Sequence, residues 1–311
     1  MNKRLKFLLV TVILFLLPAL GAFANSHEET FAEPPVPVKS TSENTLSVSG
    51  ISSYEIETSK EFIEPLPIMP RNLATSSDAF IPSDIKEEIE NRSIIGVDNR
   101  TRVTNTTAHP NAAIGQTVTT WPNGTRSNGT AWMYGNKVAV TAGHVIYNRN
   151  RGGWARQVAF YPGKNGSSNP LGVYYASQLY TDTKYVASHA YTHDWGMLRF
   201  TTNVGARTGY FGAEWTSASQ NGISVAVRGY PGEKSGQLWT ASGPIIGHQG
   251  HAKTHYTIDT TGGQSGSPGY RPSTNRAVAI HTHGVTTSGN YNRGQRIDSS
   301  LFNIITNARS W

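Results

Sequence analysis

Residues 137–144 read Lys-Val-Ala-Val-Thr-Ala-Gly-His, a short apolar run that ends in a small-residue turn and a histidine. A run this short, bounded by turn-forming residues, is typical of a buried β-strand. Similar runs recur between Asn-Gly, Pro-Gly and Gly-Gly turns, at residues 158–161 (VAFY), 197–200 (MLRF), 223–227 (ISVAV) and 277–280 (AVAI). The pattern predicts an all-β domain of many short antiparallel strands, folded as a sandwich or as a pair of barrels.

The carboxyl end carries the one good helix signal. Asp298 can cap a helix in which Leu301, Ile304 and Ile305 share one face.

The 311-residue chain contains no Cys, which excludes a disulfide framework, thiolate zinc sites, iron-sulfur ligation and a Cys nucleophile.

The first 24 residues have the composition of a secretory signal peptide. A basic start precedes the almost wholly apolar residues 7–17, and Ala22-Phe23-Ala24 fits the small-x-small cleavage signal. A transmembrane anchor is the alternative, but Pro18 breaks a run that is already marginal against the ~20 residues a span needs. We therefore expect residues 1–24 to be removed and the protein to be secreted and extracellular.

The net charge changes sign near residue 92. Residues 25–92 hold 13 Asp and Glu against 5 Lys and Arg, a net charge of −8, whereas residues 93–311 hold 19 basic against 7 acidic residues, a net charge of +12. The Pro-rich acidic stretch has little to bury, and its one regular feature is a capped short helix over residues 84–90. The opposite charges favour an acidic propeptide, 25–92, that folds back on the domain 93–311, although they also fit two parts kept soluble separately.

Three short strings carry groups that act together in nucleophilic catalysis. They are TAGH at residues 141–144, HDWG at 193–196 and TTGGQSGSP at 260–268. A serine hydroxyl is a poor nucleophile until an imidazole takes its proton, and the imidazole needs a carboxylate to fix its tautomer. His144, Asp194 and Ser265 supply these groups in that chain order.

The serine motif also allows a different fold. Residues 263–267 match the nucleophile elbow of α/β-hydrolases, in which His281 or His283 would follow the serine. That fold requires helices between parallel strands, and the domain has no such helical patterns. We therefore prefer the order His, Asp, Ser.

The three motifs resemble those of the secreted bacterial glutamyl endopeptidases, which are chymotrypsin-like serine proteases. The likeness covers residues 93–311, and it includes a mature amino terminus at 93–96 and 100–107, a turn at 228–232 and a specificity segment at 280–282 and 291–294. The resemblance implies two antiparallel β-barrels with a C-terminal helix. It also implies no cofactor and no metal.

The resemblance assigns the catalytic roles residue by residue. Ser265 attacks the scissile carbonyl, His144 acts as general base and then as general acid, and Asp194 orients His144. The backbone N–H groups of Gly263 and Ser265 form the oxyanion hole, where each preorganised donor contributes about 3 to 4 kcal/mol to transition-state stabilisation.

The specificity pocket follows in the same way. Thr260 and His281 match the residues that receive a substrate glutamate, and a hydroxyl and an imidazole N–H suit a buried carboxylate. In the resembled family, the α-amino group freed by cleavage lies near this pocket and helps to bind the substrate carboxylate. The matching residue here is Ser93. The implied function is cleavage after Glu, and more slowly after Asp, by an enzyme made as a zymogen. A trypsin-like pocket, which binds Lys or Arg, would instead need an acidic residue near Thr260. Asp259 is adjacent, but it is predicted to face the other side of its strand.

The distribution of glutamate fits this specificity. Residues 93–311 contain two Glu and residues 1–92 contain eleven, so a Glu-cleaving enzyme would spare its own domain and digest its leader. Ordinary compositional bias in a basic secreted domain is the alternative explanation for this distribution of Glu. Because Arg92 precedes Ser93, the final cut needs a separate activating protease.

We expect a monomer whose partners are protein or peptide substrates with Glu at the cleavage site, its own propeptide and the activating protease. Nucleic acid is not expected, because the basic residues are scattered. Two alternatives remain open, namely another primary specificity and a catalytically idle protein of this fold that binds anionic polymers through its charge.

Three features depart from the resemblance or lie outside it. Val145 and Gly129 stand where many relatives place a disulfide beside the catalytic histidine, and His283 stands where many have Asn. The spacing of His248, His251 and His255 suits zinc if these residues lie on a helix, but residues 255–259 look like a strand and solvated loop histidines are the alternative.

Overall fold

The computed structural model describes residues 47–48, 50–56, 94–285 and 290–310, all within the compact unit Pro37–Trp311. The predicted signal peptide, the predicted helix over residues 84–90 and Ser93 lie outside the described residues. No helix in the described ranges is long and apolar enough to cross a membrane.

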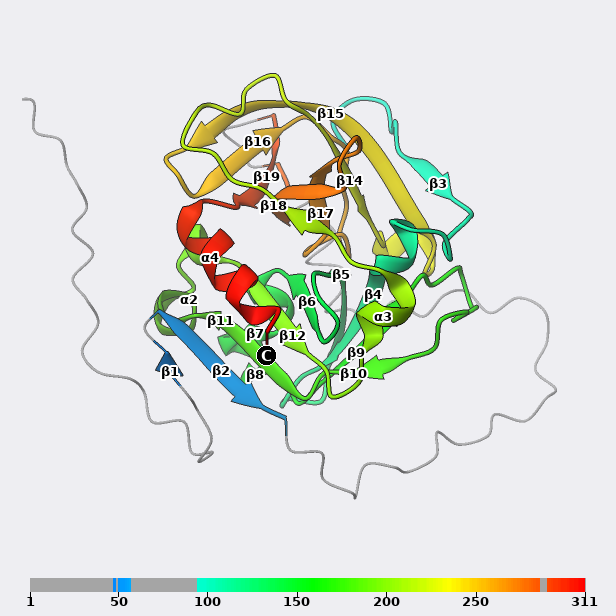
Figure 1. The fold of residues 1–311 in the computed structure, drawn as a ribbon, viewed down its shortest axis with the longest axis vertical. Helices are drawn as coiled ribbons and strands as arrows, with labels where there is room; N and C mark the ends of the chain where they lie inside the picture. The colour runs from blue at the N-terminus through cyan, green and yellow to red at the C-terminus, as the bar shows by residue number, and fades with distance from the viewer. Residues whose placement is uncertain (1–46, 49, 57–93, 286–289, 311) are drawn as a thin grey trace, which may run out of the picture. The chain divides into compact units, whose positions relative to one another are not determined.

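Two curled antiparallel sheets form the two barrels, one from each half of the domain (Figure 1). The first has the order β1-β2-β11-β12-β6-β5-β4-β9-β10. Its strands are β1 (Ser47–Val48), β2 (Ile51–Glu55), β4 (Ile114–Thr120), β5 (Arg126–Met133), β6 (Val138–Thr141), β9 (Gln157–Pro162), β10 (Tyr174–Tyr175), β11 (Gln178–Asp182) and β12 (Gly196–Arg199). The hairpin of β7 (Tyr147–Asn148) and β8 (Gly153–Trp154) is separate.

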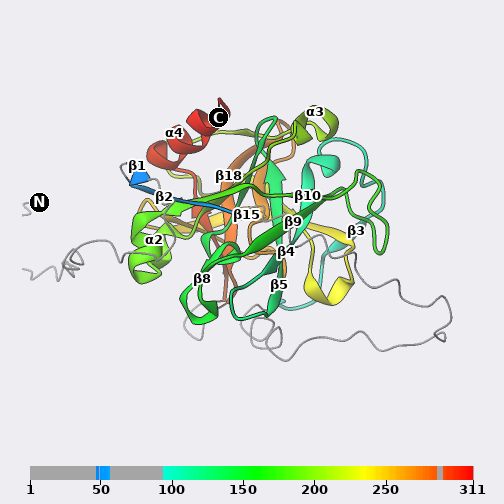
Figure 2. The same ribbon diagram turned by 90° about the horizontal axis from the view of Figure 1, so that it is seen from below.

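The second sheet has the order β13-β18-β17-β14-β15-β16-β19, and an additional pairing of β18 with β19 closes it into a ring. Its strands are β13 (Gly212–Ala213), β14 (Ser224–Gly229), β15 (Leu238–Gln249), β16 (Lys253–Tyr256), β17 (Pro268–Arg271), β18 (Arg276–His283) and β19 (Asn292–Arg296), with β3 (Thr101–Val103) paired to β15. Seen from below, strands of the first sheet lie in front of β15 and β18 (Figure 2).

These sheets confirm the predicted pair of antiparallel barrels. Each apolar run of the sequence lies in a strand, as β6, β9, β12, β14 and β18 show. The only parallel pairing among the described strands joins β13 and β18 over two residues, which rules out the doubly wound sheet of an α/β-hydrolase.

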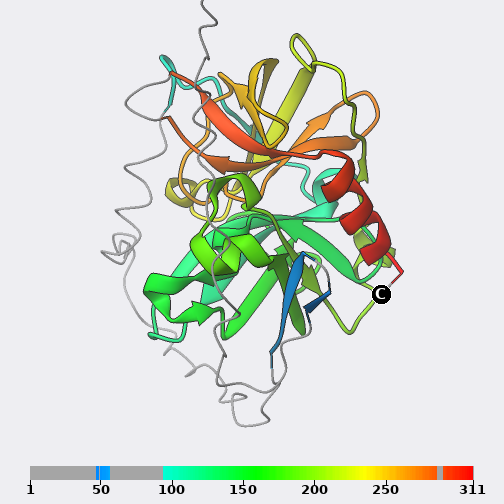
Figure 3. The same cartoon turned by 90° about the vertical axis from the view of Figure 1, so that its left-hand side faces the viewer.

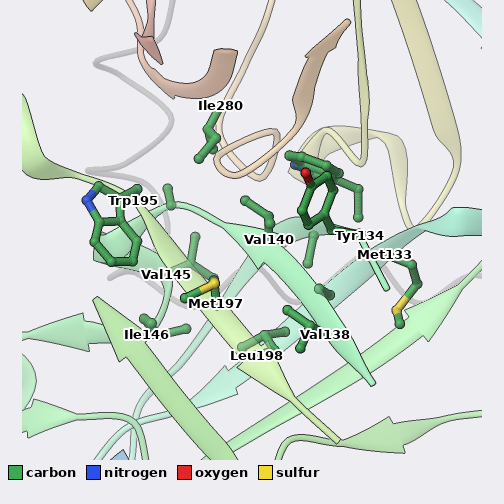
Figure 4. Packing of buried hydrophobic residues seen from close by; sticks show 14 of the residues in the cluster. Met133, Tyr134, Val138, Val140, Val145, Ile146, Trp195, Met197, Leu198 and Ile280 are labelled. Atoms are coloured by element: carbon green, nitrogen blue, oxygen red, sulfur yellow. The ribbon is translucent and has the colours of Figure 1, made fainter. Parts of the chain in front are cut away.

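The main core cluster fills the first barrel and extends to the second. Figure 4 shows Val140, Met197 and Leu198 packed together, with Ile280 of β18 approaching from the other sheet. A second cluster lies inside the second barrel and contains Val225, Val227, Ala241, Ile245, Tyr256, Ile258 and Val278. Burial of apolar side chains between curled sheets is the main stabilising contribution in this fold.

The predicted C-terminal helix is confirmed as α4 (Ser299–Ala308). The Asp298 carboxylate accepts a hydrogen bond from the Leu301 amide at 2.8 Å, and Leu301 and Ile305 are buried. The other helices are short: α2 (Thr183–Ser188), α3 (Val204–Thr208) and the 3-10 turns η2 (Asn111–Ala113), η3 (Gly143–Val145), η4 (Arg149–Arg151), η5 (Tyr191–His193) and η6 (Gly232–Lys234).

The strand β2 was not predicted. It belongs to the acidic stretch expected to have little to bury, yet it extends the first sheet beside β11 (Figure 3). The sequence signal is weak because Ile51-Ser52-Ser53-Tyr54-Glu55 has few apolar residues, and its backbone pairing depends on an edge that only the folded domain supplies.

Candidate active site

Pairing of β6 with β12 brings His144 and Asp194 together. The register aligns Thr141 with Gly196, so the turn after β6 lies beside the residues that precede β12. The His144 ring nitrogen Nδ1 lies 2.8 Å from the Asp194 Oδ2 atom, and the His144 amide donates to Asp194 Oδ1 at 2.9 Å. These two contacts from one residue fix the position of the carboxylate beside the imidazole.

Asp194 is 1% exposed. Burial by itself would raise the pKa of this carboxyl group, but His144, through its charge and its hydrogen bond, holds that pKa well below its usual range, and His283 and Lys253 add to the effect. The carboxylate therefore stays charged and can stabilise an imidazolium beside it.

The loop that carries Ser265 is held by strands of both barrels. The Thr130 amide of β5 donates to the Ser265 carbonyl at 2.8 Å, and the Gly266 amide donates to the His281 carbonyl at 2.8 Å. A Cβ atom on Gly266 would lie 3.1 Å from the Ala142 amide nitrogen, two residues before His144. The nucleophile loop and the histidine turn are therefore in contact.

The Ser265 side chain is buried, and its hydroxyl makes no hydrogen bond to any described residue. Catalytic hydrogen bonds are often long or absent before substrate binds. Gly263 adopts φ +92°, where a side chain would be strained and its Cβ would lie 2.6 Å from the Tyr230 carbonyl oxygen. Only glycine fits this loop.

Thr130 organises this loop and was missed by the sequence analysis. Its hydroxyl donates to the Gly263 carbonyl at 2.9 Å and accepts from the Tyr230 amide at 3.0 Å, and all three residues are buried. No local sequence pattern marks a threonine of one barrel as a partner of a loop in the other.

The predicted pocket residues lie on both sides of the nucleophile loop. His281 lies on β18, where its Nδ1 atom shares a hydrogen bond with the Tyr256 hydroxyl at 2.7 Å and its amide donates to the Ser267 carbonyl at 2.8 Å. Thr260 is fully buried, and its hydroxyl makes no hydrogen bond within the described part of the chain. Tyr256 was also missed, since only the β16–β18 arrangement brings it to His281.

A buried lysine lies behind the histidine–aspartate pair. The Lys253 Nζ atom contacts the Thr282 hydroxyl at 3.2 Å and lies 4.4 Å from the centre of the Tyr191 ring. Burial lowers the pKa of Lys253 to about 8, and the charge of Asp194 opposes that shift. A single lysine in a strand gives no sequence signal for this position.

The two positions that depart from the resemblance also lie here. Val145 packs against Gly129, since a Cβ atom on Gly129 would lie 3.0 Å from the Val145 methyl groups. His283 lies beside the pair, with its Nδ1 atom 3.8 Å from Asp194 Oδ2 and its ring centre 5.9 Å from that of His144.

The start of the predicted mature domain is anchored next to Thr260. The buried Asp259 carboxylate accepts hydrogen bonds from the amides of Ile95 at 2.7 Å and Asn99 at 3.0 Å. Asp259 is thus occupied by backbone donors. It lies beyond the end of β16 at Tyr256, so the strand predicted over residues 255–259 is wrong at its carboxyl end. Ser93 itself lies outside the described residues.

Arg100 ties this segment to the nucleophile loop. Its guanidinium group donates to Thr261 Oγ1 at 2.7 Å and to Gln264 Oε1 at 3.1 Å, and it forms ion pairs with Asp98 at 2.9 Å and Glu233 at 2.7 Å. Gln264 directly precedes Ser265. The buried guanidinium therefore joins the amino-terminal segment to the catalytic loop.

The histidine cluster considered for zinc does not form a ligand set. His248 accepts a hydrogen bond from the Gln220 amide at 3.1 Å, and the His255 ring stacks on Tyr291 at 4.2 Å. Across the described ranges, no group of three or more His, Asp or Glu is placed to hold a metal ion.

The paired barrels and the facing His, Asp and Ser loops define the class of trypsin-like serine peptidases. A family model for the trypsin-like peptidase domain matches residues 129–280. Among solved structures, that of "Glu endopeptidase in complex with MPD" aligns with a TM-score of 0.64 and 27% identity over 70% of this chain and 100% of that one. The Arthrobacter nicotinovorans protease Anisep, with a TM-score of 0.58 and 19% identity over 68% of this chain and 100% of that one, shares the fold.

The chain belongs to the glutamyl endopeptidase family and is a serine endopeptidase. It is 37% identical over 241 residues to the glutamyl endopeptidase of Bacillus licheniformis. This alignment covers 75% of our chain and 74% of that protein. A Bacillus subtilis protein named extracellular metalloprotease is 36% identical over 70% of each chain. The described residues of our chain offer no metal ligand set that would match that name.

Proposed function

We propose that this endopeptidase is secreted and cleaves peptide bonds after glutamate, and more slowly after aspartate, through a triad of His144, Asp194 and Ser265. Residues 1–24 act as the signal peptide, and residues 25–92 act as a propeptide that keeps the enzyme a zymogen until another protease cuts before Ser93. The mature enzyme works as a monomer on protein and peptide substrates.

One observation carries the specificity. Beside the nucleophile loop lie a fully buried threonine hydroxyl, Thr260, with no partner among the described residues, and the His281 imidazole, held by Tyr256. Several buried hydroxyls of the described residues lack a partner, Thr117 and Thr254 among them, but Thr260 lies five residues before Ser265, where a bound substrate can supply the acceptor. The carboxylate of a substrate glutamate suits both donors.

The geometry supports the following reaction. Ser265 Oγ attacks the scissile carbonyl carbon while His144 Nε2 takes its proton, and Asp194 stabilises the resulting imidazolium. The Gly263 and Ser265 amides stabilise the oxyanion. His144 then returns the proton to the leaving amine, which gives an acyl-enzyme that water hydrolyses by the same path in reverse.

The amino terminus completes the pocket in this proposal. Asp259, the residue before Thr260, accepts hydrogen bonds from the amides of Ile95 and Asn99. Ile95 is only two residues after Ser93, so the start of the mature chain is held close to Thr260. A free Ser93 ammonium would there add a positive charge that the uncut chain lacks, because its nitrogen is then an amide. A mature enzyme that keeps Arg92 should therefore lose Glu cleavage while it still reacts with a small fluorophosphonate. Full cleavage with Arg92 attached would contradict this role.

The pocket is tested with Glu and Gln versions of one peptide substrate. His281→Leu and Thr260→Val should reduce the preference for Glu over Gln and leave fluorophosphonate labelling of Ser265 largely intact. His251→Leu, at an exposed position of the same barrel, is the matched control. Unchanged Glu/Gln discrimination in both pocket variants would refute the specificity, whereas labelling that persists in Ser265→Ala would refute the triad.

A further inference from the structure

The strand β2 lies outside the predicted mature domain and is bound to it through its backbone. It runs antiparallel to β11 over five pairs, from Ile51 opposite Asp182 to Glu55 opposite Gln178. Hydrogen bonds extend the pairing at both ends, from the Thr183 amide to the Gly50 carbonyl at 3.3 Å and from the Ile56 amide to the Ser177 carbonyl at 2.9 Å. Figure 3 shows β2 on the first barrel, in blue.

Side chains of β2 enter the barrel as well. Ile51 is 8% exposed and belongs to the main core cluster. The Tyr54 ring stacks on Trp154 with 5.8 Å between the ring centres and an interplanar angle of 9°. Glu55 is exposed at the end of the strand, so the contact depends on apolar and backbone groups rather than on the opposite charges of leader and domain.

The strand that β2 covers forms the wall behind Asp194. The Thr181 hydroxyl of β11 donates to the carbonyl of Trp195, the residue after Asp194. A Cβ atom on Gly143 would lie 3.0 Å from Asp194 Oδ1, from Thr181 Oγ1 and from the Tyr185 ring, so these groups meet at one point. β11 is therefore in contact with the residues around the Asp194 carboxylate.

We propose that the edge of β11 covered by β2 is a docking site for the leader segment Ser47–Ile56, which stays bound as a separate peptide after the chain is cut before Ser93. Activation then has two steps, cleavage and later release of the strand. Release uncovers the backbone of β11, an exposed edge that can pair with other chains. This inference rests on the proposed function only for the position of the cut, because docking itself needs no proteolytic activity.

The test uses the full chain with Ser265→Ala to prevent self-digestion and a recognition site for an unrelated protease inserted between residues 57 and 92. After cleavage at that site, we expect the leader fragment to co-elute with the domain in size-exclusion chromatography. Hydrogen exchange of the β11 amides that face β2 should stay slow. A wild-type fragment that separates at once from a folded domain would overturn the proposal.

Variants locate the contact. Ile51→Asp combined with Tyr54→Ala should weaken retention of the cut leader by about a hundredfold, since it removes both buried anchors, whereas Glu55→Gln at the exposed end should not. Should the double variant fail to fold, excess synthetic peptide Ser47–Ile56 should displace the cut wild-type leader, and a scrambled peptide should not. Failure of the peptide to compete would refute docking, whatever the enzyme cleaves.

Discussion

Among single residues, Tyr256 positions His281, the histidine of the proposed pocket. Its hydroxyl contacts His281 Nδ1 at 2.7 Å, which fixes the orientation of the ring that would meet the substrate. We predict that Tyr256→Phe lowers kcat/KM on a Glu substrate by about tenfold, with little change on the Gln substrate. Tyr134→Phe, whose hydroxyl contacts Thr306 on α4 instead, is the control. Equal losses on both substrates would mean that Tyr256 acts on general structure.

Lys253 makes stability depend on pH in a defined window. Burial lowers its pKa to about 8 in the folded chain, whereas the unfolded chain keeps the ordinary value, so between these values only the unfolded state binds the proton and stability rises with pH. From pH 7 to 9.5, wild type should gain about 2 kcal/mol relative to Lys253→Met in urea unfolding, both in a Ser265→Ala background.

The exposed lysine of α2 provides the control for this measurement. Lys184→Met should leave the pH dependence of the free energy of unfolding unchanged. A wild type that tracks Lys253→Met at every pH would show that the ammonium is not held in a desolvated site.

At the element scale, α4 links the end of the second barrel to the first. Arg309 after α4 donates to the Tyr134 and Phe211 carbonyls at 2.7 and 2.9 Å, and its guanidinium lies 3.9 Å from the Tyr134 ring centre. We predict that Asp298→Ala, which removes the N-cap, lowers the free energy of unfolding by about 1 kcal/mol. Thermal unfolding measures it.

The same helix offers its own control. Asn303→Ala, on the exposed face of α4, should be neutral or slightly stabilising because alanine has the higher helix propensity. Equal losses in the free energy of unfolding for Asp298→Ala and Asn303→Ala would show that the N-cap does not stabilise α4.

At the scale of the whole molecule, the two barrels share the nucleophile loop through Thr130. Thr130→Val removes the bonds to the Gly263 carbonyl and the Tyr230 amide and leaves both buried. We predict a loss of about 2 to 3 kcal/mol in the free energy of unfolding, together with a lower kcat because the loop loses a support. Denaturant unfolding and turnover on one Glu peptide measure the two effects.

Thr117→Val provides the matched control for this change. Thr117 is fully buried in the neighbouring β4, and its hydroxyl makes no hydrogen bond to a described residue. The substitution should be neutral or stabilising there. A comparable loss at both positions would show that volume and shape, rather than hydrogen bonds between barrels, explain the effect.

Local patterns in the sequence were enough to predict the strands and to name candidate catalytic residues. Apolar runs such as residues 137–141 predict strands because their period and length are local properties, and the cap of α4 is a local motif as well. His144, Asp194 and Ser265 were predicted because the chemistry requires these residue types. The structure pairs His144 with Asp194 and places the Ser265 loop against the turn before His144, and their catalytic roles stay a prediction.

The supporting contacts depend on how distant strands pack together and could not be predicted from the sequence. Thr130, Lys253 and Tyr256 act on the site through partners in other strands, so no local pattern distinguishes them from ordinary strand residues. The strand Ile51–Glu55 was missed for the same reason. Its backbone pairs with β11 only where the folded barrel leaves that edge free, and the partner of a strand is a property of the whole fold, not of the strand's own sequence.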